Sequence, residues 1–308
     1  MGSQSDCHCE CSITGLTNGV MSRSLQLALI LAVPIAIVAA LFAVDRMYGL
    51  PSRGYDYVLR IILPPREAAI DLPTVHGPID ASRPLVVIDP GHGGHDPGAG
   101  QGAIREKDVT LAIANAIKDE LQGFGGIRVA LTREDDSYLL LAERSAIARR
   151  LRADLFLSIH ADSAENETAR GASVYVLSEK GSSQAAARIA KRENSSDAVN
   201  GVPLDNQNDD VNAILLDLSQ TGAQTGSSQM ARLLLRELEG SAPLHSETIQ
   251  SAAFAVLKAP DVPSVLFETG YISNAGDAAY LSSAAGRKDI SEAAAQAVRA
   301  FFARQSGS

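Results

Sequence analysis

The stretch that most constrains the fold is Leu85–His95, which reads LVVIDPGHGGH. An apolar run leads into Asp89 and Pro90, and glycines then surround His92 and His95. This pattern predicts a short buried strand that ends in a tight, Gly-rich turn. In α/β folds such turns lie at the carboxyl ends of the strands, where ligands bind. The stretch therefore predicts an α/β protein that presents an imidazole at one edge of its sheet.

Helical and strand-like patterns alternate after this first strand. The predicted helices cover residues 107–122 and 139–152, and the predicted strands cover residues 127–132, 155–160 and 172–177. The second helix carries Arg144 on its predicted polar side. Such alternation is typical of a single twisted, mostly parallel sheet with helices on both faces.

The segment 178–250 differs in composition, because it is rich in Ser, Asn, Gln and Asp. The elements predicted from residue 178 onward are helices at 182–193 and 210–239, strands at 253–257 and 263–268, and a closing helix at 289–303. The residues between the first two of these helices have the polar composition of an exposed loop. The closing helix has one apolar stripe, as expected for a helix that covers a core.

The N-terminal part has no core pattern. Residues 1–20 contain all three cysteines and are interpreted as a disordered extension or a mis-assigned start. Residues 21–46 contain an uncharged apolar run, which predicts a transmembrane anchor or a cleaved signal segment. Residues 47–84 contain six prolines and are predicted to be a linker with one short strand at 57–63. We therefore expect residues 85–305 to form one domain outside the cytoplasm.

Charge and cysteine content exclude two classes of protein. The net charge is −9, and no dense run of Lys or Arg is present, so we expect no nucleic-acid partner. The cysteines all lie in the first eleven residues, so no disulfide is expected within the domain.

Polar side chains stand where three of the predicted strands end. His92 follows the first strand, and His160 and Glu268 end two later strands. Glu106 lies just before the first helix. Two imidazoles and one carboxylate form a common catalytic zinc set with a fourth position for water, and a second carboxylate would serve as general base. The pattern alone leaves open whether Glu106 or Glu268 is the ligand.

Each of these residues also has a purely structural interpretation. His160 could be a satisfied core histidine, Glu106 a helix-start acid that suits the helix dipole, and Glu268 a surface acid. Together they favour a site, because packing does not gather acids and imidazoles at one sheet edge. A phosphate-binding turn is disfavoured, since no G-K-[ST] follows the glycines. Candidates for orienting the imidazoles are His95, Asp96 and Asp162.

Six blocks of the sequence resemble the zinc-dependent N-acetylmuramoyl-L-alanine amidases of the amidase_3 family. The blocks read VVIDPGHGGHDPGA, REKDVTLAIA, LTREDD…LAERSAIA, DLFLSIHADS, GASVYVLS and FAVLKAPDVPSVLFETGYISN. They follow the family's order from about Leu85 to Ala303. The resemblance implies hydrolysis of the amide between N-acetylmuramic acid and L-alanine in peptidoglycan. Two rival functions are a zinc peptidase acting on stem peptides and a catalytically silent envelope scaffold.

The resemblance also implies a role for each candidate residue. His92, Glu106 and His160 would hold one Zn²⁺ per chain, and Glu268 would be the catalytic acid/base. His95 and Asp162 lie close to these residues in the sequence, which makes them candidate partners of the site rather than ligands.

The segment that begins at Ser178 resembles the insert of the cell-division, AmiB/AmiC-like subgroup. In that subgroup a helix covers the active site until an activator with a LytM-type domain displaces it. The resemblance implies that 178–250 holds a regulatory helical insert, that the helix at 182–193 is the cover, and that Glu193 supplies a carboxylate to the zinc. Glu179 is the alternative ligand, and an ordinary surface helix is the alternative interpretation. The implied setting is the periplasm during daughter-cell separation, with membrane contact through the N-terminal segment if it is uncleaved.

Overall fold

The computed structural model describes residues 72–164, 166, 168–199, 202–203 and 213–305, together with scattered helical positions between 32 and 43. Residues 1–68 and 69–308 form two separate units, and the sheet belongs to the second. The predictions for 1–20 and 57–63, and most of that for 21–46, lie outside the described residues. Within the described part of the chain, no helix is long and apolar enough to cross a membrane.

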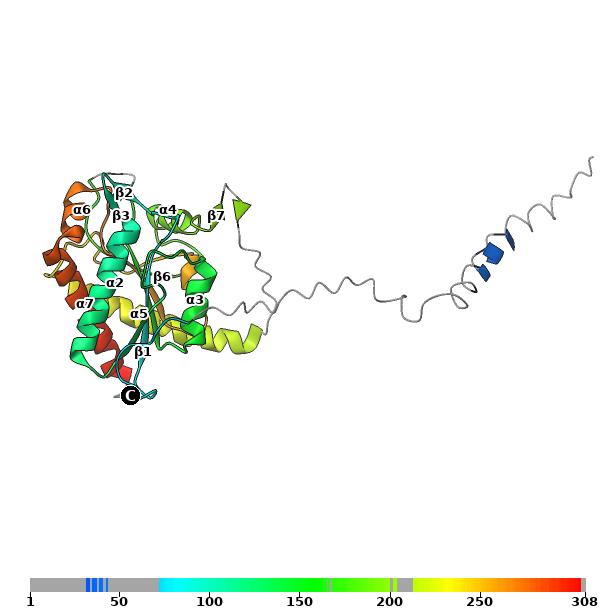
Figure 1. Ribbon diagram of the computed structural model, residues 1–308, viewed down its shortest axis with the longest axis horizontal. Helices are drawn as coiled ribbons and strands as arrows, with labels where there is room; N and C mark the ends of the chain where they lie inside the picture. Colours follow the sequence, from blue (N-terminus) through cyan, green and yellow to red (C-terminus); the bar gives the residue numbers. More distant parts are fainter. Residues whose placement is uncertain are drawn as a thin grey trace, which may run out of the picture. The chain divides into compact units, whose positions relative to one another are not determined.

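One six-stranded sheet forms the centre of the second unit (Figure 1). Its strands, in spatial order, are β4 (Arg128–Leu131), β1 (Leu85–Pro90), β5 (Leu155–His160), β10 (Ser264–Glu268), β6 (Ser173–Leu177) and β9 (Gln250–Ala252). All neighbouring pairs run parallel except β10 with β6. The predicted mostly parallel sheet is therefore confirmed.

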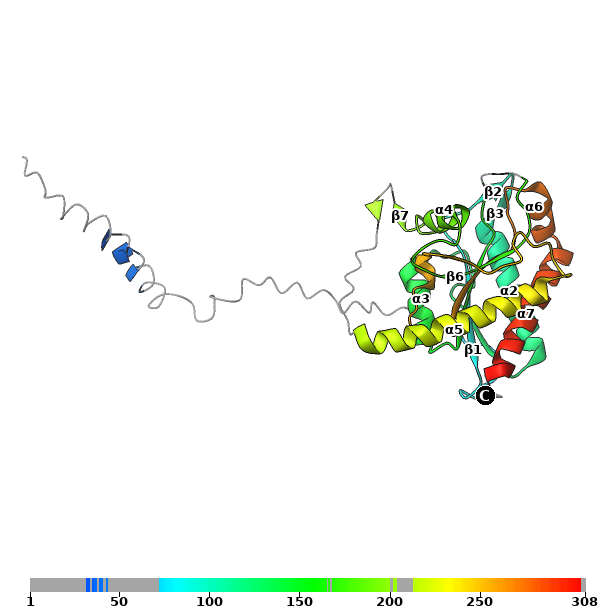
Figure 2. The same ribbon diagram turned by 180° about the vertical axis from the view of Figure 1, so that it is seen from behind.

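Helices cover both faces of the sheet, as the alternation of elements predicted. One face carries α2 (Glu106–Phe124), α5 (Ala213–Leu238) and α7 (Ala284–Gln305), and the other carries α3 (Leu141–Arg150), α4 (Gln184–Glu193) and the short 3₁₀ helix η1 (Ala255–Leu257). In Figure 1, α2 and α7 lie on one side of the sheet and α3 on the other. Figure 2 shows the molecule from behind, where α5 lies toward the viewer. The fold class is α/β.

The alternating side chains of the strands divide the core into two layers. In β1, Val86 and Ile88 pack with α2, α5 and α7, whereas Val87 packs with α3 and α4. Helix α2 buries Ile113 and Ile117, which stand one turn apart and therefore share a face. Because both faces of the central strands are covered, these strands read as continuous apolar runs.

Two of the sequence predictions need correction near the C-terminus. The strand predicted at 253–257 is wrong, because β9 lies just before it and residues 255–257 form η1. Val256 and Leu257 are buried, as the predicted strand required. A short apolar run alone does not distinguish a buried strand from a buried helical turn. Helix α6 (Ala275–Ser282) was not predicted, although the Asn274 side chain caps it by accepting hydrogen bonds from two backbone N–H groups.

The segment 178–250 contributes to two different parts of the fold. Helix α4 lies at the same end of the molecule as the small hairpin of β2 (Gly100–Gln101) and β3 (Ile104–Arg105) (Figure 1). It is followed by a second hairpin of β7 (Ala198–Val199) and β8 (Val202–Pro203). Helix α5, in contrast, buries Met230 and Leu234 in the central core. Of the two helices described in this segment, α4 is therefore the one placed to cover the carboxyl ends of the strands.

Candidate active site

The turn after β1 is built from residues that lie unusually close to the site. A Cβ atom on Gly91 would lie 2.5 Å from the His160 ring, and one on Gly98 would lie 2.6 Å from both Glu106 Oε2 and His92 Cδ2. His92 itself has a φ of 60°, in the left-handed region. Glycine is therefore required at both positions so that the backbone can approach the imidazoles and the carboxylate.

Four buried side chains converge on one point. The ligand atoms of His92, Glu106, His160 and Glu193 all lie within 4.8 Å of one another. His92 Nε2 is 3.1 Å from Glu106 Oε2 and 3.4 Å from Glu193 Oε2. His160 Nδ1 is 3.3 Å from Glu106 Oε1 and 3.0 Å from Glu193 Oε2. His92 Nε2 and His160 Nδ1, the two nitrogens that face the cluster, make no hydrogen bond. This is the arrangement expected of ligand atoms that share a cation.

The side chains around these four hold them in place. Glu106 accepts backbone hydrogen bonds from Ala161 at Oε1 and from Ala99 at Oε2, each at 2.8 Å. His92 Nδ1 lies 2.7 Å from Asp96 Oδ2, which fixes the ring so that Nε2 faces the cluster. His95 is exposed and lies against Tyr138 instead, with the ring centroids 4.1 Å apart. Of the three candidates considered from the sequence, His95, Asp96 and Asp162, Asp96 is the one that contacts and orients His92.

The electrostatics of the cluster favour positive charge at its centre. Burial lowers the pKa of His92, but the nearby Glu106, Asp96 and Glu193 carboxylates raise it overall to well above 6.5. Burial also lowers the pKa of His160, but the Glu193 and Glu106 carboxylates raise it overall to about 10. Despite burial, the imidazoles lower the pKa of Glu193 to about 2. A divalent cation can satisfy the same carboxylates without protons on the rings.

Glu268 lies beside this cluster in a second group of acids. The carboxylate atoms of Asp162, Glu193 and Glu268 lie within 4.8 Å of one another. The Asp162 N–H donates to Glu268 Oε2 at 3.1 Å, whereas Glu268 Oε1 has no hydrogen-bond partner. Burial and the Asp162 carboxylate raise the pKa of Glu268 well above 4.5, and burial and Glu193 raise that of Asp162 to about 7. A buried carboxyl group of raised pKa is suited to transferring protons.

Two buried arginines support the turn that carries His92. Arg144 donates to Asp89 Oδ1 at 3.0 Å and to the His92 carbonyl oxygen at 2.8 Å. Arg133 donates to the Gly91 carbonyl oxygen at 2.8 Å. The sequence placed Arg144 on a polar helix face, and this is wrong, since only 2% of the residue is exposed. A helical period cannot identify a guanidinium that turns inward to satisfy loop carbonyls.

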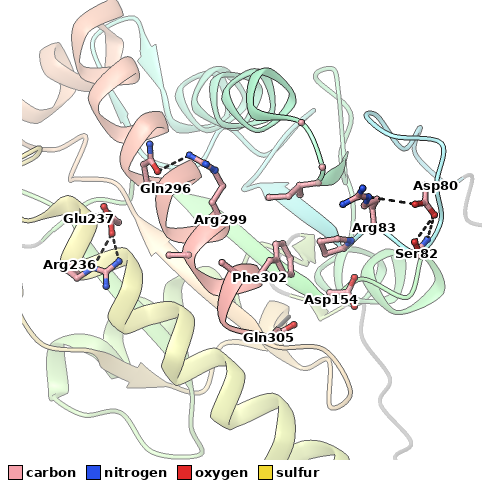
Figure 3. A pocket seen from close by; sticks show the side chains of 16 residues that line it. Asp80, Ser82, Arg83, Asp154, Arg236, Glu237, Gln296, Arg299, Phe302 and Gln305 are labelled. Carbon is pink, nitrogen blue, oxygen red and sulfur yellow. Dashed lines mark hydrogen bonds and ion pairs between the residues drawn. The ribbon is translucent and has the colours of Figure 1, made fainter. Parts of the chain in front are cut away.

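A separate pocket of about 940 Å³ lies at the other end of the strands (Figure 3). Its lining includes Pro84 and Asp154, which precede β1 and β5. Two of its arginines already face acids, since Arg83 lies beside Asp80 and Arg236 beside Glu237. None of the clustered imidazoles and carboxylates lines this pocket, so the candidate site is elsewhere.

Comparison with known proteins shows which family this chain matches. Residues 86–300 match the family model Amidase_3, described as N-acetylmuramoyl-L-alanine amidase. The chain belongs to this family. AmiA of Escherichia coli is 42% identical over 220 residues, which are 71% of this chain and 76% of AmiA. AmiC of Neisseria meningitidis is 41% identical over 222 residues, which are 71% of this chain and 53% of that protein.

A solved amidase also shares the fold. AmiC2 of Nostoc punctiforme is 28% identical and aligns with a TM-score of 0.51, covering 72% of this chain and 98% of that one. The amidase family predicted from the six sequence blocks is thus confirmed, and so is the AmiB/AmiC-like subgroup. The chain spans only about half of the length (53%) of the Neisseria AmiC.

Proposed function

We propose that this protein is a zinc-dependent amidase that hydrolyses the bond between N-acetylmuramic acid and L-alanine in peptidoglycan. The observation that carries the proposal is the buried cluster of two imidazoles and two carboxylates beside Glu268, in a chain of the amidase family. His92, Glu106 and His160 are the proposed ligands. The two imidazole nitrogens that lack hydrogen bonds support a metal in this position.

The donor set fits zinc, because nitrogen and carboxylate ligands with one further position are typical of catalytic zinc sites. Bound there, zinc would lower the pKa of a water molecule and polarise the scissile carbonyl. Glu268 is the proposed acid/base. Its unpartnered Oε1 can accept the proton of the attacking water and return it to the leaving nitrogen of L-alanine. Asp96 and the backbone donors to Glu106 keep the ligands oriented during this transfer.

Helix α4 is the proposed autoinhibitory element. Ser183 caps its N-terminus, and Ile189 and Ala190 pack into the core on the α3 side of the sheet. These contacts carry the buried Glu193 to both imidazoles, where it occupies the position that water must take. Glu179 is exposed, which supports Glu193 as the insert's ligand. We propose that an activator with a LytM-type domain moves α4 away.

The remaining elements of the proposal concern the setting of the reaction. The substrate is peptidoglycan, and the proposed location is the periplasm, reached through the N-terminal segment as an anchor or a signal. The proposed role is the separation of daughter cells, in keeping with relatives named AmiA and AmiC.

The decisive experiment is digestion of purified sacculi by the full chain, by a Glu193→Ala variant and by a Glu268→Gln variant, with and without a chelator. Released stem peptides with a new L-alanine amino terminus, lost on chelation and restored by zinc, are the expected products. Cleavage inside the stem peptide would instead identify a zinc peptidase. An inert Glu193→Ala variant with zinc bound would identify a silent scaffold.

A further inference from the structure

Asp162 is a buried acid beside the site, and the proposed mechanism gives it no task. It is 2% exposed, and its carboxylate accepts hydrogen bonds from the Arg192 Nε at 2.9 and 3.0 Å and from the Arg192 Nη2. Arg192 immediately precedes Glu193 at the end of α4. The side chain of Arg192 is 41% exposed, so it enters the site from outside. The Ser163 N–H also donates to Asp162 Oδ1, so Asp162 is an acceptor whose side-chain donor is supplied by the covering helix.

The position of Asp162 relative to Glu268 suggests what replaces Arg192. Both acids lie within 4.8 Å of Glu193, and the Asp162 N–H fixes Glu268 Oε2. A substrate amide that takes the place of Glu193 therefore has two different acids within reach. In the proposed function, Glu268 delivers a proton to the leaving nitrogen.

That nitrogen has one hydrogen and, after water has attacked the carbonyl, one lone pair. The lone pair must face Glu268 to receive the proton. The N–H then points in a different direction from the lone pair and needs an acceptor of its own, because a buried donor without a partner is costly. Asp162 is the second acid within 4.8 Å of the position that Glu193 occupies, and its carboxylate can accept this N–H.

We propose that Asp162 is a substrate-positioning residue that accepts the N–H of the leaving L-alanine and so directs the nitrogen lone pair toward Glu268. No bond to Asp162 forms or breaks, and the hydrogen stays on the nitrogen. In the closed state Arg192 takes the place of this N–H, just as Glu193 takes the place of water. Release of α4 therefore frees both positions together. This role rests on the proposed amidase function.

The test uses two soluble muropeptide substrates, one with the natural amide and one with L-lactate in place of L-alanine, so that an ester oxygen replaces the N–H. The full-length Glu193→Ala variant is the parent, and Asp162→Ala and Asp162→Asn are added to it. We expect Asp162→Ala to lower kcat/KM for the amide about fivefold to tenfold, which is the effect of one lost hydrogen bond. The kcat/KM for the ester should stay within about twofold of the parent. Asp162→Asn retains an acceptor oxygen, so we expect it to stay within about twofold of the parent for both substrates.

A binding measurement accompanies the kinetics. Glu268→Gln is added to prevent turnover. Calorimetry should then show that Asp162→Ala weakens the binding of the amide substrate more than the binding of the ester substrate. Asp261→Ala is the matched control, because Asp261 is exposed and pairs with Arg149. Bound zinc and the unfolding midpoint are measured for every variant.

Three outcomes would overturn the role of Asp162. One is an unchanged amide kcat/KM in Asp162→Ala, the second is an equal loss for amide and ester, and the third is equal impairment of Asp162→Asn and Asp162→Ala. An equal loss for both substrates would mean that Asp162 acts only through the structure. If the Glu193→Ala parent hydrolyses neither substrate, the amidase function itself is wrong, and this result is distinct from the other three.

Discussion

Replacing Glu193 by alanine should convert the closed protein into a constitutively active one. Glu193 Oε2 lies 3.0 Å from His160 Nδ1 and 3.4 Å from His92 Nε2, and the residue is buried. Removing one partner of a buried ion pair costs about 3–5 kcal/mol, so we take about 3 kcal/mol for the loss of these contacts. Each 1.4 kcal/mol changes an equilibrium tenfold, and the closed-to-open ratio should therefore fall about 100-fold.

The assay is dye release from labelled cell wall without an activator, together with hydrogen exchange of the α4 amides. We expect faster dye release, by up to about 100-fold, and faster exchange across α4. Glu179→Ala is the matched control, since this glutamate precedes α4 and is exposed. A folded, zinc-loaded Glu193→Ala variant that is no more active than the parent protein would refute the reasoning.

Three further changes test the site and its support. Glu268→Gln should keep bound zinc but lose at least about 100-fold in hydrolysis, as expected for removal of a general acid/base, and elemental analysis with dye release would check this. Gly91→Ala puts a methyl group where the His160 ring lies, so zinc affinity measured by chelator competition should fall at least about tenfold; unchanged affinity would contradict the packing. Burial raises the pKa of Asp89, but Arg144 and two hydroxyl donors lower it overall below 3.8. Asp89→Asn should therefore lower the free energy of unfolding in urea by about 3 kcal/mol at pH 7. This difference should persist down to about pH 4 and shrink as the pH falls through the lowered pKa of Asp89. A difference that stays constant into acid would exclude this ion pair as its source.

The sequence was sufficient to predict the layers of the fold and the place of the site. The continuous apolar runs of β1, β5 and β10 require cover on both faces, and the helical stripes between them supply it. Because these three strands are neighbours that run parallel, their carboxyl ends meet. The residues at those ends, His92 and Glu268 among them, are therefore brought together by topology alone.

What the sequence could not decide was which side chains meet across long separations. Its pattern does not reveal that Arg144 turns inward beneath the His92 turn, or that Arg192 reaches Asp162 thirty residues earlier in the chain. These contacts depend on the three-dimensional path of loops and on which buried carbonyl or carboxylate lacks a partner. Residue types and spacing therefore determined the strand ends and the candidate ligands they present. Only the packed structure decided that the last turn of α4 places one carboxylate on the imidazoles and one guanidinium on the neighbouring acid.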